Sequence, residues 1–119
     1  MPRMAAEDYT LSKIDDCLII RMNADNLLGI VEVNRIGSKF EALLKDPLKK
    51  VVLDLTPVRY AGSAALGMLV AFSKSLRANG GRLILCGTHH LDTLFRVSRT
   101  VAVFEIAPDV NAALKMLQQ

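Results

Sequence analysis

Short apolar runs alternate with segments of helical periodicity along this chain of 119 residues. The segment "DYTLSKIDDCLIIRM" predicts a hairpin, because an apolar arm from Cys17 to Met22 follows a turn signal at Asp15 and Asp16. Apolar residues then recur at helical spacing and stop before Pro47. They are Val33, Ile36, Phe40, Leu43 and Leu44. The first part of the chain therefore predicts two strands followed by a helix.

The rest of the chain continues as an alternation of strands and helices. A helix is predicted from Ser63 to Asn79, where Gly80 and Gly81 stop it. The other elements are strands at "KKVVLDL", "RLILC" and "VAVFEI" and helices at "HLDTLFRVS" and "DVNAALKMLQQ". The order β-β-α-β-α-β-α-β-α predicts an α/β sandwich with right-handed crossovers. We expect one domain over residues 1–119, with about four helices and a mixed, mostly parallel sheet whose hairpin adds an antiparallel edge.

Composition and charge exclude several classes of protein. Hydrophobic residues make up 51% and charged residues 23%, which argues against disorder. The net charge of +3 is scattered and the chain has no Trp, so a nucleic-acid interface is disfavoured. Cys17 and Cys86 form no C-x-x-C pair, which suits a reducing compartment. No apolar run approaches the ~20 residues of a membrane span, and the opening "MPRMAAEDYT" lacks a secretory signal. We therefore expect a soluble, cytoplasmic protein.

Motifs that would indicate catalysis are incomplete. Gly62 and Gly67 have the glycine spacing of a phosphate-binding loop, but Met68 stands where the lysine should be. Ala61 and Ala65 occupy both glycine positions of a nucleophile elbow around Ser63. The dinucleotide fingerprint G-x-G-x-x-G is absent. The sequence therefore predicts no catalytic residue and no cofactor.

Two other sets of polar residues are candidates for a site. Cys86, His89 and His90 follow a predicted strand and could suggest a metal, but structural zinc takes four ligands. The alternative is a polar loop that enters a helix with Thr88 as its N-cap. Asp54 lies in a buried-looking run without an obvious acid partner. We predict no metal site and no carboxylate pair.

The helix that begins at Ser63 has two distinct faces. At 100° per residue, one arc of large apolar residues should face the sheet, and it comprises Leu66, Leu69, Val70 and Leu76. The opposite side collects small residues and one methionine, and it comprises Ala64, Gly67, Met68, Ala71, Ser75 and Ala78. This second face is either covered by another layer of the fold or is a surface on which a protein docks closely.

Ser63 itself has a structural and a functional interpretation. Serine is a preferred N-cap, because its hydroxyl accepts a hydrogen bond from an orphan backbone N–H. A phosphate on Ser63 would also meet the positive end of the helix dipole. It would bring nearly two negative charges to the edge of an apolar face. The serine can therefore be a cap in one state and an off-switch in the other.

The chain resembles a STAS domain of the bacterial anti-sigma factor antagonist type over nearly its whole length. The most specific stretch is "VVLDLTPVRYAGSAALGMLVAFSKSLRANGGRLILCG". Within it, Ser63 matches the serine that a partner kinase phosphorylates, and Leu66 matches the helix leucine. The second-strand acidic signature survives loosely in "NADNLL", where Asp25 matches one acid.

The resemblance implies a partner switch. The partner is an anti-sigma factor that is also an ATP-dependent serine kinase, and a serine phosphatase resets the switch. The implied contact residues are Gly62, Ser63, Ala64, Gly67, Met68, Ala71 and Asp25. Gly62 stands where the family usually has aspartate, and Ala65 where it usually has glycine. The aspartate lost at position 62 motivates an alternative, a STAS scaffold or transporter-associated subunit that is never phosphorylated; a small enzyme or ligand-binding domain is a third possibility.

Overall fold

The computed structural model describes residues 8–45, 50–100 and 102–118. A five-stranded sheet in the order β1-β2-β4-β6-β7 lies at its centre. Its strands are β1 (Tyr9–Ile14), β2 (Cys17–Met22), β4 (Lys50–Asp54), β6 (Arg82–Cys86) and β7 (Glu105–Ala107). β1 pairs with β2 in the antiparallel sense, and the other neighbours are parallel. The mixed, mostly parallel sheet with an N-terminal hairpin is therefore confirmed.

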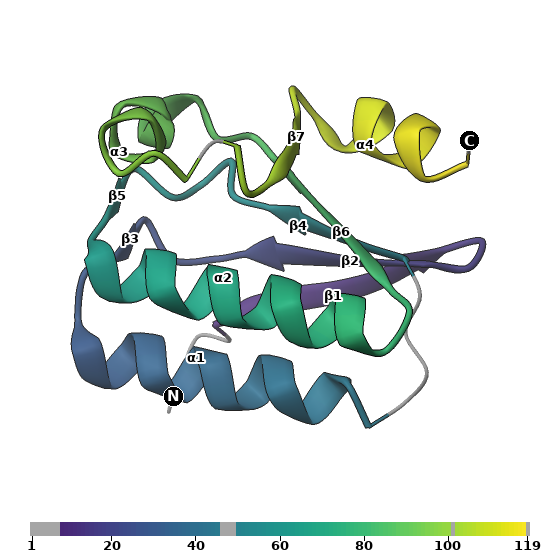
Figure 1. Cartoon of the computed structure of the whole chain (residues 1–119), viewed down its shortest axis with the longest axis horizontal. Coiled ribbons are helices and arrows are strands. Elements are labelled where there is room, and N and C mark those ends of the chain that lie inside the picture. The colour runs from purple at the N-terminus through teal and green to yellow at the C-terminus, as the bar shows by residue number, and fades with distance from the viewer. Residues whose placement is uncertain (1–7, 46–49, 101, 119) are drawn as a thin grey trace, which may run out of the picture.

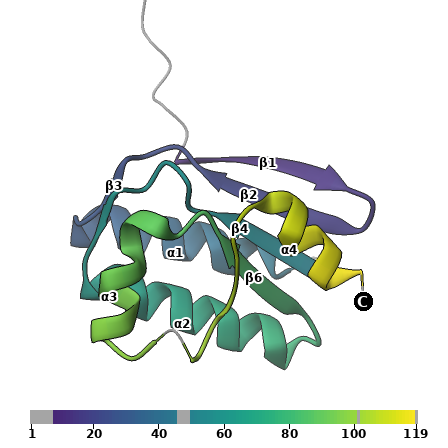
Figure 2. The ribbon, with the colours of Figure 1, turned by 90° about the horizontal axis from the view of Figure 1, so that it is seen from above.

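The helices cover the two faces of the sheet unequally. They are α1 (Ile30–Leu43), α2 (Ser63–Ala78), the 3-10 turn η1 (His89–Leu91), α3 (Asp92–Val97) and α4 (Val110–Leu117). Figure 1 shows α1 and α2 side by side beneath the sheet and α4 above it. Seen from above in Figure 2, α4 lies over the strands, with α1 and α2 beyond them. The four predicted helices are thus present in the predicted order.

The strands are buried on both sides because their side chains alternate between two cores. In β2, Leu18 and Ile20 belong to the larger core under α1 and α2, whereas Cys17 and Ile19 belong to the smaller core under α4. In the larger core, the rings of Phe40 from α1 and Phe72 from α2 lie 4.9 Å apart. The near-continuous apolar runs seen in the sequence follow from this double burial.

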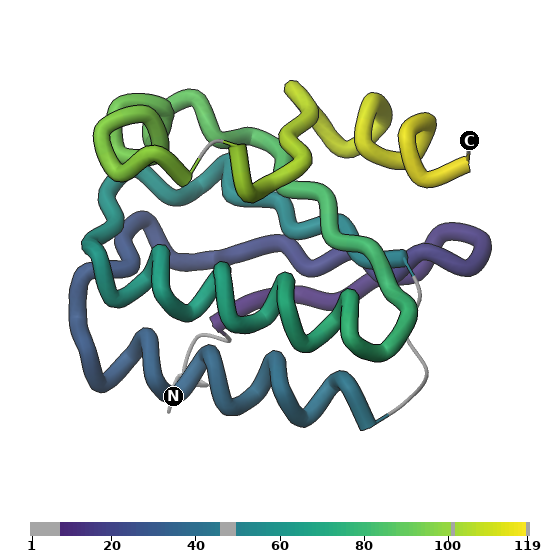
Figure 3. The backbone as a smooth tube through the Cα atoms, in the orientation of Figure 1, coloured from purple at the N-terminus to yellow at the C-terminus, as the bar shows by residue number. Residues whose placement is uncertain are grey.

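A second, two-stranded sheet was not predicted. β3 (Asn26–Leu27) pairs in parallel with β5 (Tyr60–Ala61) beside the start of α2. The backbone carbonyl of Asp25 accepts hydrogen bonds from the N–H groups of Arg59 and Tyr60, at 2.7 and 3.3 Å. Figure 3 shows these two segments side by side where the chain enters α2. The pairing therefore joins two parts of the chain that are more than thirty residues apart in sequence.

The last strand differs from its prediction. A strand was predicted at "VAVFEI", but residues 102–104 are turn and bend, and β7 begins at Glu105. The side chain of Phe104 turns inward instead, with its ring 5.7 Å from that of Phe95. Val101 and Pro47, to which two of the predicted boundaries refer, lie outside the described residues. The prediction is therefore right about the strand and wrong about where it begins.

Candidate functional site

Ser63 is the first residue of α2 and is exposed. The N-cap is Gly62, whose extended backbone directs its carbonyl to the N–H groups of Ala65 and Leu66, at 3.1 and 3.3 Å. The prediction that Ser63 caps the helix is therefore wrong, because the chain enters the helix one residue earlier at a glycine that needs no side chain. The Ser63 hydroxyl has no hydrogen-bond partner among the described residues. It is free to react or to be contacted.

The pairing of β3 with β5 brings Asp25 to the same end of the molecule as Ser63. Gly62 N–H donates to the carbonyl of Leu27 at 3.3 Å, which ties the start of α2 to the segment that follows Asp25. The Asp25 side chain is exposed, and its Oδ1 accepts a hydrogen bond from Asn26 Nδ2 at 3.0 Å. Two candidate residues 38 positions apart in sequence therefore lie on one end of the fold.

Four large apolar residues that the sequence did not single out are exposed in the segments that lead into α1 and α2. Leu28, Ile30, Val31 and Tyr60 have exposed fractions of 56%, 65%, 73% and 58%, and we call these four residues the apolar corner. A Cβ placed on Gly62 would lie 3.9 Å from Leu28 Cδ2. The sequence signal was the apolar run "NLLGIVEV", in which only Leu27 and Val33 are buried in the core. Clustered exposed apolar residues of this kind usually mark a protein-binding site.

A groove of about 730 Å³ lies between α1 and α2. Four of the predicted contact residues form its α2 wall, namely Ala64, Gly67, Met68 and Ala71. Gly67 and Ala71 are exposed, but Met68 is half-buried against α1. A Cβ on Gly37 of α1 would lie 3.0 Å from Met68 Cγ. Both alternatives for this face hold in part, because α1 covers its Met68 side and leaves Gly67 and Ala71 exposed.

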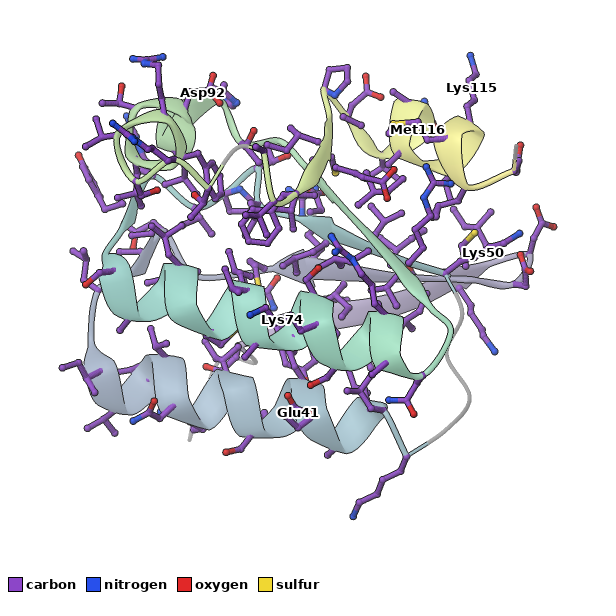
Figure 4. The ribbon with its side chains drawn as sticks, viewed as in Figure 1. Glu41, Lys50, Lys74, Asp92, Lys115 and Met116 are labelled. Atoms are coloured by element: carbon purple, nitrogen blue, oxygen red, sulfur yellow. The ribbon has the colours of Figure 1, made fainter. Side chains whose placement is uncertain are left out.

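The two walls of the groove differ in polarity. Ser75 Oγ donates to Glu41 Oε1 at 3.2 Å and so links α2 to α1. Figure 4 labels Glu41 on α1 and Lys74 on α2. The α2 wall is therefore made of small and apolar residues, whereas the α1 wall also carries the polar side chains of Asn34, Ser38 and Glu41.

Asp54 is a buried residue whose role is structural. Its carboxylate accepts hydrogen bonds from Thr56 N–H at 3.0 Å and Thr56 Oγ1 at 2.5 Å and pairs with Arg21 Nη1 at 3.2 Å.

Burial, followed by the negative charges of Asp54 and Asp109, raises the pKa of the Cys86 thiol to about 12. Cys86 is therefore a neutral core residue rather than a nucleophile or a metal ligand.

The two histidines lie on η1, which contacts β5. Both are exposed, and their ring centroids are 4.1 Å apart. Desolvation and the positive charges of His89 and Arg59 lower the pKa of His90. Across residues 8–45, 50–100 and 102–118, no three His, Cys, Asp or Glu residues are grouped as metal ligands would be. No helix in the same part of the chain is long and apolar enough to cross a membrane.

Comparison with known proteins gives a consistent result. A model of the STAS domain family matches residues 8–113. BtrV of Bordetella bronchiseptica, named for anti-sigma factor antagonism, is 29% identical over 105 residues, 87% of this chain and 89% of BtrV. An anti-sigma-factor antagonist (STAS) domain protein from Planctomyces limnophilus has a TM-score of 0.80 at 24% identity and covers 94% of this chain and 99% of its own. SpoIIAA of Bacillus in its phosphorylated form has a TM-score of 0.66 at 17% identity, over 91% of this chain and 98% of that chain.

Proposed function

This chain belongs to the STAS domain family, and from that premise we propose that it is an anti-sigma factor antagonist. Its partner is an anti-sigma factor of the serine-kinase type, which itself binds the ATP. Phosphorylation of Ser63 by that partner breaks the complex, and a serine phosphatase restores the binding form. The chain is then a regulator that acts by binding and carries no catalytic residue of its own.

The observation that carries this proposal is the free hydroxyl of Ser63, exposed at the first position of α2, together with the apolar corner and the groove. A phosphate there is stabilised by the N-terminal end of the helix, so the modified domain stays folded. Against an apolar partner the same two negative charges must lose their water, at a cost of several kcal/mol if they stay unpaired. Modification therefore weakens binding without unfolding the protein.

The proposed contact surface combines the predicted residues with the apolar corner. The predicted residues are Gly62, Ser63, Ala64, Gly67, Met68, Ala71 and Asp25. Large exposed apolar side chains at the corner supply area for burial, and small residues along α2 allow the partner's backbone to approach closely. Support also comes from the names of BtrV and of the Planctomyces limnophilus protein.

Binding and phosphorylation by a cognate kinase-type anti-sigma factor test the proposal. With ATP, we expect one phosphate per chain on Ser63 and an affinity at least tenfold lower for the phosphorylated protein. Ser63→Ala should accept no phosphate and should bind like the unmodified wild type. Equal affinities of the unmodified and the fully phosphorylated protein would refute the switch.

A matched pair of substitutions on α2 tests the surface. Ala71 is exposed on the groove wall, and Ala78 is exposed at the end of the same helix, outside the groove. Ala71→Glu should abolish partner binding at nearly unchanged melting temperature, whereas Ala78→Glu should bind normally. Met68→Lys should lose both partner binding and stability, because Met68 packs on α1 and its lysine would be partly buried. Normal binding by Ala71→Glu would remove the groove from the interface.

A second candidate function rests on Gly62. This residue offers no side chain beside Ser63, so the carboxylate typical of the family at that position is missing. A STAS scaffold or transporter-associated subunit would need the docking surface but no phosphate. Tight binding to a partner without any incorporation of phosphate into Ser63 would favour this candidate.

A further inference from the structure

The loop of residues 55–62 connects β4 to α2 and delivers Ser63 to the surface. Its second half is held by backbone hydrogen bonds to the segment around β3, which accepts from Arg59, Tyr60 and Gly62. Its first half is held by the buried side chains of Leu55 and Val58, by their backbone hydrogen bonds, and by one further anchor that involves a side-chain carboxylate. These anchors hold the path of the chain between β4 and α2.

The further anchor of the first half is the Asp54 carboxylate. The side chain is 5% exposed, and Thr56 gives it two donors, beside Arg21 and a hydrogen bond with the Cys86 side chain. Thr56 donates from its backbone N–H and from Oγ1, and Arg21 supplies the third donor. A buried carboxylate that lost one of these donors would be left partly unsatisfied. The Thr56 side chain therefore holds the loop in this conformation as it leaves the sheet.

The turn that follows β6 packs closely against Thr56. Gly87 has φ +66°, a conformation that glycine adopts easily, and a Cβ there would lie 2.1 Å from Thr56 Oγ1 and 2.8 Å from Thr56 N. Leu55 N–H also donates to the carbonyl of Cys86 at 2.9 Å. Thr56 is thus fixed between Asp54 on one side and the backbone of the β6–η1 connection on the other.

We propose that Thr56 is a positioning residue of the partner-binding surface. Its hydroxyl bond to Asp54 sets the path of residues 57–62 and so the placement of Tyr60 and Ser63, on which binding and phosphorylation depend. This inference rests on the proposed function for its consequence, but not for the effect on the loop itself. Asp54 is buried, but Thr56 itself is exposed, so a loss of partner binding alone would not distinguish positioning from a direct contact. The effect on the loop in the free protein makes that distinction.

Matched variants separate positioning from stability. Thr56→Val keeps the size of the side chain and removes the hydroxyl, whereas Thr56→Ser keeps the hydroxyl. Glu105→Gln is the stability control, because it weakens the ion pair with Arg82 at the opposite end of β6. For the kinase-type anti-sigma factor, we expect Thr56→Val to raise the Kd and the KM for Ser63 phosphorylation at least fivefold with kcat little changed. Thr56→Ser and Glu105→Gln should stay within twofold of the wild type.

Hydrogen exchange of the free protein tests the loop without any partner. Thr56→Val should speed exchange of the Tyr60 and Gly62 amides at least tenfold, while amides of α4 keep their rates. Unchanged exchange at these two amides, or a Thr56→Ser variant as impaired as Thr56→Val, would overturn the inference. Faster exchange together with wild-type affinity would overturn its functional half. A wild-type protein that binds no kinase-type anti-sigma factor would instead refute the proposed function.

Discussion

Gly67→Ala should make the protein more stable and a poorer binder. Gly67 lies inside α2, is exposed, and a Cβ built on it meets no atom within 4 Å apart from its chain neighbours and the adjacent helix backbone. Glycine in a helix interior is about 0.5–1 kcal/mol less favourable than alanine, chiefly through backbone entropy. Because the new methyl group creates no clash, we expect that gain nearly in full. For a domain of this size it corresponds to a rise in melting temperature of roughly 2–6 °C.

The same methyl group projects from the groove wall into the space that a closely docked partner would occupy. Overpacking of a well-fitted contact costs about 1–3 kcal/mol, and about 1.4 kcal/mol is already tenfold in affinity. Stability and affinity should therefore change in opposite directions. If this face had a purely structural role, stability and partner affinity would change in the same direction, or affinity would not change.

Thermal denaturation and a binding titration with the anti-sigma partner measure the two quantities. Gly37→Ala is the comparison on the α1 wall, where the new Cβ would lie 3.0 Å from Met68 Cγ and should yield less stabilisation. A loss of stability in Gly67→Ala would refute the argument that this position is open. A rise in stability with wild-type affinity would refute close docking at Gly67.

Three further predictions follow from individual side chains. Ser63→Ala should change the free energy of unfolding by less than about 0.5 kcal/mol, because the hydroxyl caps nothing. Ser63→Asp should stabilise the protein by ~0.3–1 kcal/mol, because its carboxylate meets the positive end of the helix dipole. A loss above about 1 kcal/mol in either variant, measured by chemical denaturation, would contradict this prediction. Hydrogen bonds and charge from Arg35 and Lys39 lower the pKa of Asp8 to about 2, so its contribution to stability is full above pH 4 and is lost as pH falls toward 2. Asp8→Asn should therefore cost about 1–2 kcal/mol at pH 7 and flatten that acid limb, whereas an unchanged limb would argue against the pairing. Burial raises the pKa of both Cys17 and Cys86, so a disulfide reagent at pH 8 should label the native protein far more slowly than the denatured one, and equal rates would contradict their burial.

The sequence predicted the fold well where burial imposes a period on the residues. The apolar arm from Cys17 to Met22 and the helix that begins at Ser63 have the predicted starts, because both pack on the large core. The helix wheel placed Leu66, Leu69 and Leu76 correctly, and Val70 packs at the edge of the same core. It omitted Phe72, which is fully inside and stacks on α1.

What the sequence could not show depends on contacts between distant segments. β3 and β5 have two residues each and are held by a partner more than thirty positions away, so no local pattern reveals them. The cap was misplaced because glycine and serine are both good N-caps, and only the backbone distinguishes Gly62 from Ser63. The apolar corner could not be predicted, because an apolar run such as "NLLGIV" is typical of a buried segment. Only the fold shows which of its residues are exposed. The predicted phosphorylation and contact residues stay predictions that only a partner can test.

Among the described helices, α4 packs on the face of the sheet opposite α1 and α2, and this placement has a practical consequence. Figure 4 shows Lys115 and Met116 on α4, across the sheet from Glu41 on α1. Lys115 is exposed, and the small core beneath α4 includes no residue of α1 or α2. A fluorophore or a surface tether on Lys115 would therefore report on complexes or immobilise the protein with the Ser63 end still open to solution. The protein can therefore be attached through α4 while partner binding is measured at the Ser63 end.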